Sequence, residues 1–206
     1  MDFSELLARY RLMAIVRGSD PAACERTAEV LVESGVRLLE VSLTSADAVG
    51  VLTRICSKLG GGAHIGAGTV LTSADATKTR DAGATFAVTP ALGEGVDAAL
   101  ELGMPVLAGA MTPTEVLAAH RAGAAAVKLF PAGSLGPGYV KALGDPFPGL
   151  GLVPVGGVGL ADVREYLNAG ALAVGVGSPL GGDAPHGGDL DALRERAARF
   201  VAAARG

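Results

Sequence analysis

The sequence predicts an α/β fold in which short parallel strands alternate with helices. Two observations support this prediction: a pattern of helix, glycine and strand recurs five times, and no segment interrupts it. Five helix-period segments end at a glycine, and each is followed within a few residues by a short apolar run: these glycines are Gly35, Gly83, Gly103, Gly123 and Gly170. Glycine is expected just past a helix because it adopts the left-handed conformation without steric cost. No linker, low-complexity block or charge run breaks the pattern, so we expect residues 1–206 to form a single domain.

The repeat extends to eight strands separated by helices. We expect the strands at 13–17, 37–41, 63–67, 85–88, 104–108, 125–129, 151–155 and 172–176. We expect the helices at 21–34, 45–58, 73–81, 94–102, 112–121, 138–143, 160–167 and 189–205. This alternation fits a compact (β/α)₈ barrel, the TIM barrel, at the short end of its length range. A doubly wound open sheet is the alternative, but it would usually have fewer strands and a clearer glycine-rich first turn.

Several helix starts carry local signals. Asp20-Pro21 begins the helix at 21–34, because an aspartate caps the first N–H groups and proline fits the first helical turn. Ser73 with Asp75 marks the helix at 73–81, and Thr112-Pro113 marks the helix at 112–121. The element boundaries therefore agree with the repeat.

Composition narrows the class of protein. Half of the residues are hydrophobic and the net charge is −4, so a sizeable core is expected and neither nucleic acid nor an anionic membrane surface is an expected partner. The chain begins without a signal peptide and has no apolar stretch near the ~18 residues of a membrane span, which predicts a soluble, cytoplasmic protein. Cys24 and Cys56 lack metal-binding or redox spacing and are expected to be reduced thiols.

Lys128 stands at the centre of the apolar run 124–132, which is predicted to be a buried strand. A buried ammonium is costly, and a lysine in this setting is typical of an amine nucleophile with a lowered pKa. The alternative is a side chain that reaches solvent or pairs with a carboxylate.

Few other polar residues occur at the C-terminal ends of the expected strands, where such barrels carry their chemistry: Arg17, Glu40, Thr69 and Thr89. An amine, a carboxyl and a guanidinium together favour Schiff-base chemistry on a keto acid. The lysine would attack the ketone, the carboxyl would move protons, and the arginine would bind the carboxylate. A Glu40–Lys128 ion pair that serves only the fold is the alternative, although such pairs rarely stabilise more than apolar residues of equal volume.

Glycine-rich turns follow the last two expected strands and suggest a phosphate site. Gly156-Gly157 follows the seventh strand and Gly177-Ser178 follows the eighth, the place where (β/α)₈ barrels most often hold phosphate. Ser134 and Gly136 could close the same site. The segment 181–188 is expected to be only a loop before the last helix.

No metal or cofactor is expected. His64, His120 and His186 are isolated, with no ligand spacing to one another or to acidic clusters. We expect His64 in the core or at the barrel rim and His120 on a helix surface.

Five motifs, in this order and spacing, resemble the Schiff-base 2-keto-3-deoxy-6-phosphosugar-acid aldolases. They are the segments 39–43 (LEVSL), 65–70 (IGAGTV), 86–90 (FAVTP), 127–131 (VKLFP) and 155–157 (VGG). The resemblance implies that Lys128 forms the imine and Glu40 is the general acid/base. It also implies that Arg17 binds the carboxylate, that Thr69 and Pro90 lie near the pyruvate moiety with Phe130 over it, and that the enzyme is a homotrimer.

Two types within this family differ in the configuration that they accept at C4 of the substrate. The resemblance favours the phosphogalactonate type, because Val155 stands where the phosphogluconate type usually has threonine, and Thr44 and Gly133 stand where that type often has arginine and an acidic residue. Phosphogluconate, dual or 4-hydroxy-2-oxoglutarate specificity stays open. So do two other functions on the same fold: a phosphate-binding epimerase or synthase, and a non-catalytic sugar-phosphate sensor.

Overall fold

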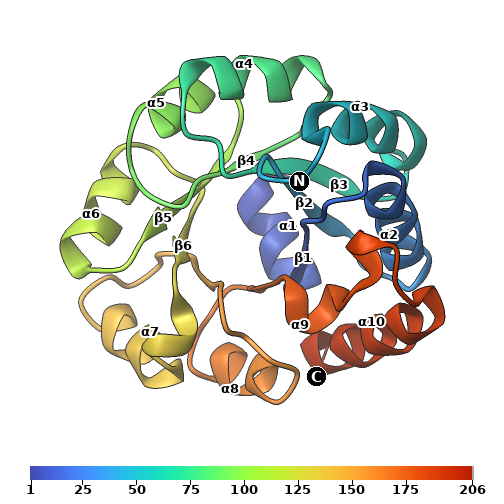
Figure 1. Cartoon of the computed structure of the whole chain (residues 1–206). Helices are drawn as coiled ribbons and strands as arrows, with labels where there is room; N and C mark the ends of the chain where they lie inside the picture. The colour runs from blue at the N-terminus through green and yellow to red at the C-terminus, as the bar shows by residue number, and fades with distance from the viewer. Residues whose placement is uncertain (206) are drawn as a thin grey trace.

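The computed structural model describes residues 1–205 and shows eight parallel strands surrounded by a ring of helices (Figure 1). The strands are β1 (Leu12–Val16), β2 (Leu38–Ser42), β3 (His64–Gly68), β4 (Ala87–Val88), β5 (Val106–Ala110), β6 (Ala126–Leu129), β7 (Leu152–Pro154) and β8 (Val174–Val176). Each strand from β1 to β6 pairs with the next in sequence, and β8 pairs with β1. A single bridge between Val155 and Gly175 joins the β7 and β8 sides. The predicted (β/α)₈ barrel is confirmed.

Helices follow the strands in the expected order. They are α1 (Phe3–Tyr10), α2 (Pro21–Glu33), α3 (Ala48–Leu59), α4 (Ser73–Asp81), α5 (Glu94–Glu101), α6 (Pro113–Arg121), α7 (Pro137–Gly144), α8 (Asp162–Asn168), α9 (Ser178–Gly181) and α10 (Leu190–Arg205), with 3₁₀ turns η1 (Ala132–Ser134) and η2 (Ala184–His186). Asp20 and Thr112 cap α2 and α6 as expected. For α4 the capping residue is Thr72, whose hydroxyl accepts a hydrogen bond from the Asp75 N–H, and Ser73 is the first helical residue.

Helix α1 was not predicted from the sequence, and it closes the N-terminal end of the barrel. Figure 1 shows α1 within the ring formed by the outer helices. The Phe3 ring stacks on Phe86 with 4.5 Å between centroids, and the Ser4 hydroxyl donates to the Ala125 carbonyl at 2.7 Å. Leu7 is fully buried in the same cluster, which fills the interior of the barrel. The barrel is therefore filled with side chains at the end opposite the C-terminal ends of its strands.

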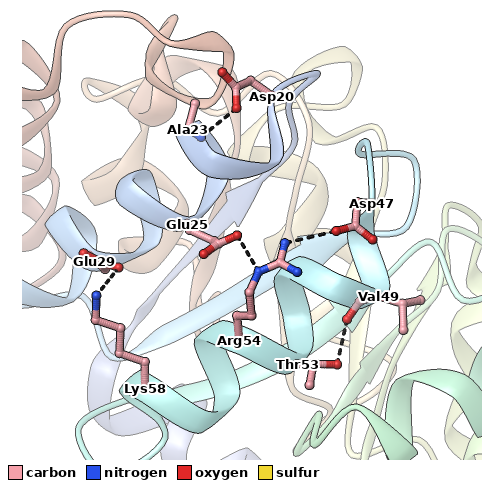
Figure 2. Close-up of polar contacts among 9 residues, drawn as sticks. All are labelled: Asp20, Ala23, Glu25, Glu29, Asp47, Val49, Thr53, Arg54 and Lys58. Atoms are coloured by element: carbon pink, nitrogen blue, oxygen red, sulfur yellow. Dashed lines mark hydrogen bonds and ion pairs between the residues drawn. The ribbon is translucent and has the colours of Figure 1, made fainter.

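Exposed ion pairs join the outer helices α2 and α3 (Figure 2). The Arg54 guanidinium binds Glu25 at 2.6 Å and Asp47 at 3.0 Å, and the Lys58 ammonium binds Glu29 at 2.6 Å. Solvent screens pairs of this kind, so each contributes little to the free energy of unfolding. None of the helices within residues 1–205 has the length and apolar character needed to cross a membrane.

Candidate active site

A cavity of about 310 Å³ opens at the C-terminal ends of the strands. Eleven of the residues that the sequence nominated for the site line it: Arg17, Glu40, Thr69, Pro90, Lys128, Phe130, Val155, Gly156, Gly157, Gly177 and Ser178. The structure thus brings these residues, from seven of the eight strand–loop units, into one site. Ser42, Pro185 and His186 also line the cavity, and sequence reasoning missed them.

Lys128 lies in β6, next to Gly109 of β5 and Val153 of β7, and is 6% exposed. Within residues 1–205 it has no carboxylate partner within 4.0 Å, so the ion pair considered as an alternative is not formed. Its Nζ lies 5.3 Å from the centroid of the Phe130 ring, which stabilises a cation through the ring electrons. The amine is therefore buried, and its environment leaves it accessible only from the cavity.

Glu40 lies in the middle of β2 and is 2% exposed. A side chain at Gly68, on the neighbouring strand β3, would overlap the Glu40 carboxylate, so glycine at 68 makes the room for it. Oε2 of Glu40 has no hydrogen-bond partner among the described residues. Burial raises the pKa of this carboxyl, and the positive charges of Lys128 and Arg17 oppose the rise without cancelling it. A buried carboxyl with a raised pKa and an oxygen free of hydrogen bonds to the described residues is suited to proton transfer.

Arg17 does not end the first strand as predicted. Strand β1 ends at Val16, and Arg17 is the next residue, with an exposed side chain on the rim of the cavity. It also lines a shallow neighbouring hollow together with Thr44 and His186. Because no ion pair holds its guanidinium within residues 1–205, Arg17 is available to bind an acidic group at the rim.

A row of hydroxyl groups borders the site beside Glu40. Ser42 Oγ lies 3.1 Å from Thr69 Oγ1 and 2.8 Å from Thr44 Oγ1. Thr69 adopts φ +62°, a left-handed conformation that is strained for a β-branched residue. Strained backbone of this kind occurs often at functional sites, and Thr69 lines the cavity.

Thr89 and Pro90 have different roles. Thr89 is buried and its Oγ1 accepts a hydrogen bond from the Gly109 N–H at 3.2 Å, so it supports β5 and does not line the cavity. Pro90 does line it. Gly109 permits this arrangement, because a side chain there would overlap the Pro90 carbonyl.

The glycine turn after β7 presents backbone to the cavity. Gly156 and Gly157 have φ of +86° and +78°, a conformation that favours glycine. Within residues 1–205, the N–H groups of Gly156, Gly157 and Gly177 donate to no protein oxygen. Because all three glycines line the cavity, these free N–H groups could bind an anion there. The expectation that Ser134 and Gly136 close this part of the site is wrong, because neither lines the cavity; Gly133 instead donates its N–H to the Gly156 carbonyl at 2.8 Å.

The segment 181–188 is more than the connecting loop expected from the sequence. It contains the end of α9 and the turn η2, which brings Pro185 and His186 to the cavity. The one sequence feature that could have indicated this role is His186 itself, a single histidine in the glycine-rich stretch after the last strand. His64 is half-buried at the start of β3 and His120 is exposed on α6. Within residues 1–205 no three His, Cys, Asp or Glu side chains are grouped as metal ligands.

A buried amine and a buried carboxyl lie together at the C-terminal face of a (β/α)₈ barrel, the face at which enzymes of this fold have their active sites. Residues 3–195 match the family model described as KDPG and KHG aldolase. The chain belongs to this family of aldolases, which are lyases that cleave carbon–carbon bonds. It is thus an aldolase rather than the epimerase, synthase or sensor considered from the sequence.

Relatives of both substrate types are similar to the chain. A probable 2-dehydro-3-deoxy-6-phosphogalactonate aldolase of Rhizobium meliloti (strain 1021) is 37% identical over 194 residues, covering 93% of this chain and 90% of the relative. A 2-dehydro-3-deoxy-phosphogluconate aldolase of Pseudoalteromonas atlantica (strain T6c / ATCC BAA-1087) is 34% identical, with 87% and 84% covered. The solved structure of native KDPGal superposes with a TM-score of 0.88 at 33% identity, with 94% of each chain covered.

Proposed function

We propose that the enzyme cleaves a phosphorylated 2-keto-3-deoxy sugar acid through a Schiff base on Lys128. The observation that carries this proposal is a buried lysine that has no carboxylate partner among residues 1–205, in the same cavity as a buried glutamate with an oxygen that no described residue binds. In the proposed reaction the neutral Lys128 amine attacks the C2 ketone, and loss of water gives the protonated imine. Glu40 delivers the proton that lets water leave.

Cleavage then needs a base and an electron sink. Glu40, now ionised, takes the proton from the C4 hydroxyl as the C3–C4 bond breaks, and the bonding electrons move into the imine to give an enamine. The aldehyde, D-glyceraldehyde 3-phosphate, is released. Protonation of the enamine at C3 and hydrolysis of the imine return pyruvate and the free lysine. The raised pKa of Glu40 supports this double role, because burial favours the protonated form that acts as the acid while Lys128 and Arg17 favour the ionised form that acts as the base.

The two ends of the cavity suit the two ends of this substrate. Arg17 and the Thr69 hydroxyl provide donors for the carboxylate of the keto acid, with Pro90 and Phe130 as the walls of that pocket. The unpaired N–H groups of Gly156, Gly157 and Gly177, with the Ser178 hydroxyl, provide donors for the phosphate. Binding at both ends would align C2 with the lysine.

The direct test of the mechanism is to trap the imine. Incubation with pyruvate and borohydride should add a reduced three-carbon unit to the peptide that contains Lys128, and Lys128→Met should abolish both the adduct and turnover. Peptide mass spectrometry measures the adduct. Lys141→Met, on helix α7 outside the cavity, is the matched control and should keep both. A folded enzyme without an adduct on Lys128 would overturn the proposal.

For the substrate we propose 2-dehydro-3-deoxy-6-phosphogalactonate. Val155 supports this choice: it lines the cavity, and Gly175 leaves space for its side chain, so an apolar group stands where a threonine would offer a hydroxyl. The phosphogluconate epimer is the second candidate, because relatives named for it are nearly as similar.

Cleavage rates on the two C4 epimers decide between these candidates. The galactonate epimer should have the higher kcat/KM, and Val155→Thr should shift the ratio toward the gluconate epimer by about 5- to 100-fold, the effect of one hydrogen bond in a substrate site. Val155 is buried and a hydroxyl there carries a cost, so the Tm of Val155→Thr must show that the variant is folded before its rates are compared. A wild-type preference for the gluconate epimer would reverse the assignment.

We further propose that residues 1–206 act as one catalytic domain and that the enzyme is a cytoplasmic homotrimer. Leu71 and Met111, in the loops after β3 and β5, are exposed apolar side chains that a partner subunit could cover. Sedimentation should then give three times the 20.4 kDa chain mass, and a monomer would refute the assembly.

A further inference from the structure

His186 is presented to the cavity by a backbone that is fixed on several sides. It ends η2, and its N–H donates to the Asp183 carbonyl at 2.9 Å. The carbonyl of the preceding residue, Pro185, accepts a hydrogen bond from the Cys24 thiol at 3.6 Å. Gly18 lets this carbonyl approach, because a side chain at 18 would overlap it. The turn is therefore seated against α2 and the loop after β1, and the imidazole starts from a defined position.

The imidazole ring is oriented by Ser19. The Ser19 N–H donates to Nδ1 at 3.3 Å, and the Ser19 hydroxyl lies 2.9 Å from the same atom. A backbone N–H can only donate, so Nδ1 carries the lone pair and the proton of the neutral ring is on Nε2. Nε2 has no hydrogen-bond partner among residues 1–205. The ring thus offers one N–H donor that the protein does not use.

The wall on which His186 lies is short of polar side chains. The cavity-lining residues from Val155 onward are otherwise valine, glycine, proline and Ser178. Over this wall, in the described part of the chain, Ser178 and His186 are the two side chains that can donate a hydrogen bond, and there is no lysine or arginine. The two cations of the cavity are assigned to the keto-acid end: Lys128 lies on β6, and Arg17 follows β1, the neighbour of β8, where it also borders the hollow beside His186.

We propose that His186 binds the phosphate group of the substrate through Nε2–H, with Ser19 holding the ring for that contact. The inference rests on the proposed function and adds a specificity-determining residue to it. A phosphate dianion has more acceptor sites than the glycine N–H groups and Ser178 can fill, and a donor held by its own partner binds it without loss of ring freedom. His186 takes no part in bond making or breaking.

The test compares a phosphorylated substrate with the same keto acid lacking its phosphate. His186→Ala should raise KM for the phosphorylated substrate, and the inhibition constant of inorganic phosphate, by about tenfold, the effect of one hydrogen bond to a charged group. kcat and the KM of the unphosphorylated acid should change by less than about twofold. His186→Gln, whose amide N–H can replace Nε2–H, should recover most of the loss. His120→Ala, on exposed α6, is the control and should match the wild type.

Equal losses on both substrates would overturn the proposal, because they would indicate a structural role for the turn. Unchanged constants for the phosphorylated substrate and for inorganic phosphate would overturn it as well. Trapping of pyruvate on Lys128 separates this result from a failure of the proposed function: an adduct in both wild type and His186→Ala upholds the Schiff base whatever the role of His186, whereas its absence in wild type refutes the Schiff base itself.

Discussion

Glu40 lowers the stability of the fold whenever its carboxyl is ionised, because the buried charge lacks a hydrogen bond on Oε2. The raised pKa expresses the same cost: the folded protein holds the proton more tightly than the unfolded chain does. A residue chosen only for stability at this position would be apolar. The carboxyl at the centre of β2 therefore indicates a function that outweighs its cost.

Glu40→Gln should separate stability from activity. Below the ordinary carboxyl pKa of 4.5 the wild-type Glu40 is protonated in both states, and the two proteins should be equally stable. As pH rises through the raised pKa of the folded state, the wild type loses stability, so the variant should have the higher Tm at neutral pH. Thermal unfolding across pH measures this difference. The kcat of Glu40→Gln should fall by about 10²- to 10⁴-fold, because the variant lacks the acid/base group.

Glu115→Gln provides a control of opposite sign. Hydrogen bonds from the Met111 and Thr112 N–H groups hold the pKa of Glu115 below its ordinary value. Its contribution is therefore present above pH 4.5 and is lost as pH falls through the lowered pKa, so this variant should be the less stable one at neutral pH. A Glu40→Gln Tm below that of the wild type at neutral pH would contradict the assignment of Glu40 as a buried, destabilising charge.

Charged residues inside apolar runs made the centre of the site predictable, whereas Ser42 and His186 were missed. Lys128 and Glu40 are conspicuous because burial of charge is costly anywhere. Ser42 gives no such signal, because a hydroxyl is tolerated in strands, and its contact with Thr69 depends on the pairing of β2 with β3. His186 reaches the cavity only because η2 packs against Gly18, a contact over long sequence separation.

At the scale of elements, α1 shows what the repeat could not predict. Its ends use a capping box between Asp2 and Glu5 and a left-handed Arg11 in place of the usual glycine. It therefore lacked the terminal glycine by which five of the other helices were found. The strand predictions were better at the position of the strands than at their ends: β4 is only Ala87–Val88, because Thr85 and Phe86 precede the regular pairing.

Phe3→Ala should lower the free energy of unfolding by about 3 kcal/mol, as expected for a large core residue. Phe3 is 5% exposed and stacks on Phe86, so truncation leaves a void under the barrel interior. Urea unfolding measures the change. Val49→Ala, at a 38% exposed position on α3, is the control and should stay within about 0.5 kcal/mol of the wild type. An equally small effect for Phe3→Ala would show that α1 contributes little to the core.

At the scale of the whole molecule, the barrel was predictable because each repeat carries its own local signals. Five glycines end helices just before strands, and their φ values of +73° to +101° explain why glycine is used there. The contact that closes the barrel between β7 and β8 could not be predicted from the sequence. The β7 and β8 sides meet through one bridge, in which the side chain of Val155 fits over Gly175. That fit depends on three-dimensional stagger, which no local pattern encodes.

The filling of one barrel end by α1 has a kinetic consequence. Within the described chain the cavity opens at the opposite end, with Lys128 and Glu40 buried and the Ser178 and His186 side chains exposed at the rim. In the proposed reaction both products share this one exit. The phosphorylated aldehyde stands in front of the keto acid that is still bonded to the lysine, so the aldehyde leaves first and pyruvate last. In the direction of synthesis the order reverses. Pyruvate must bind to the lysine first, because a bound aldehyde would block its entry.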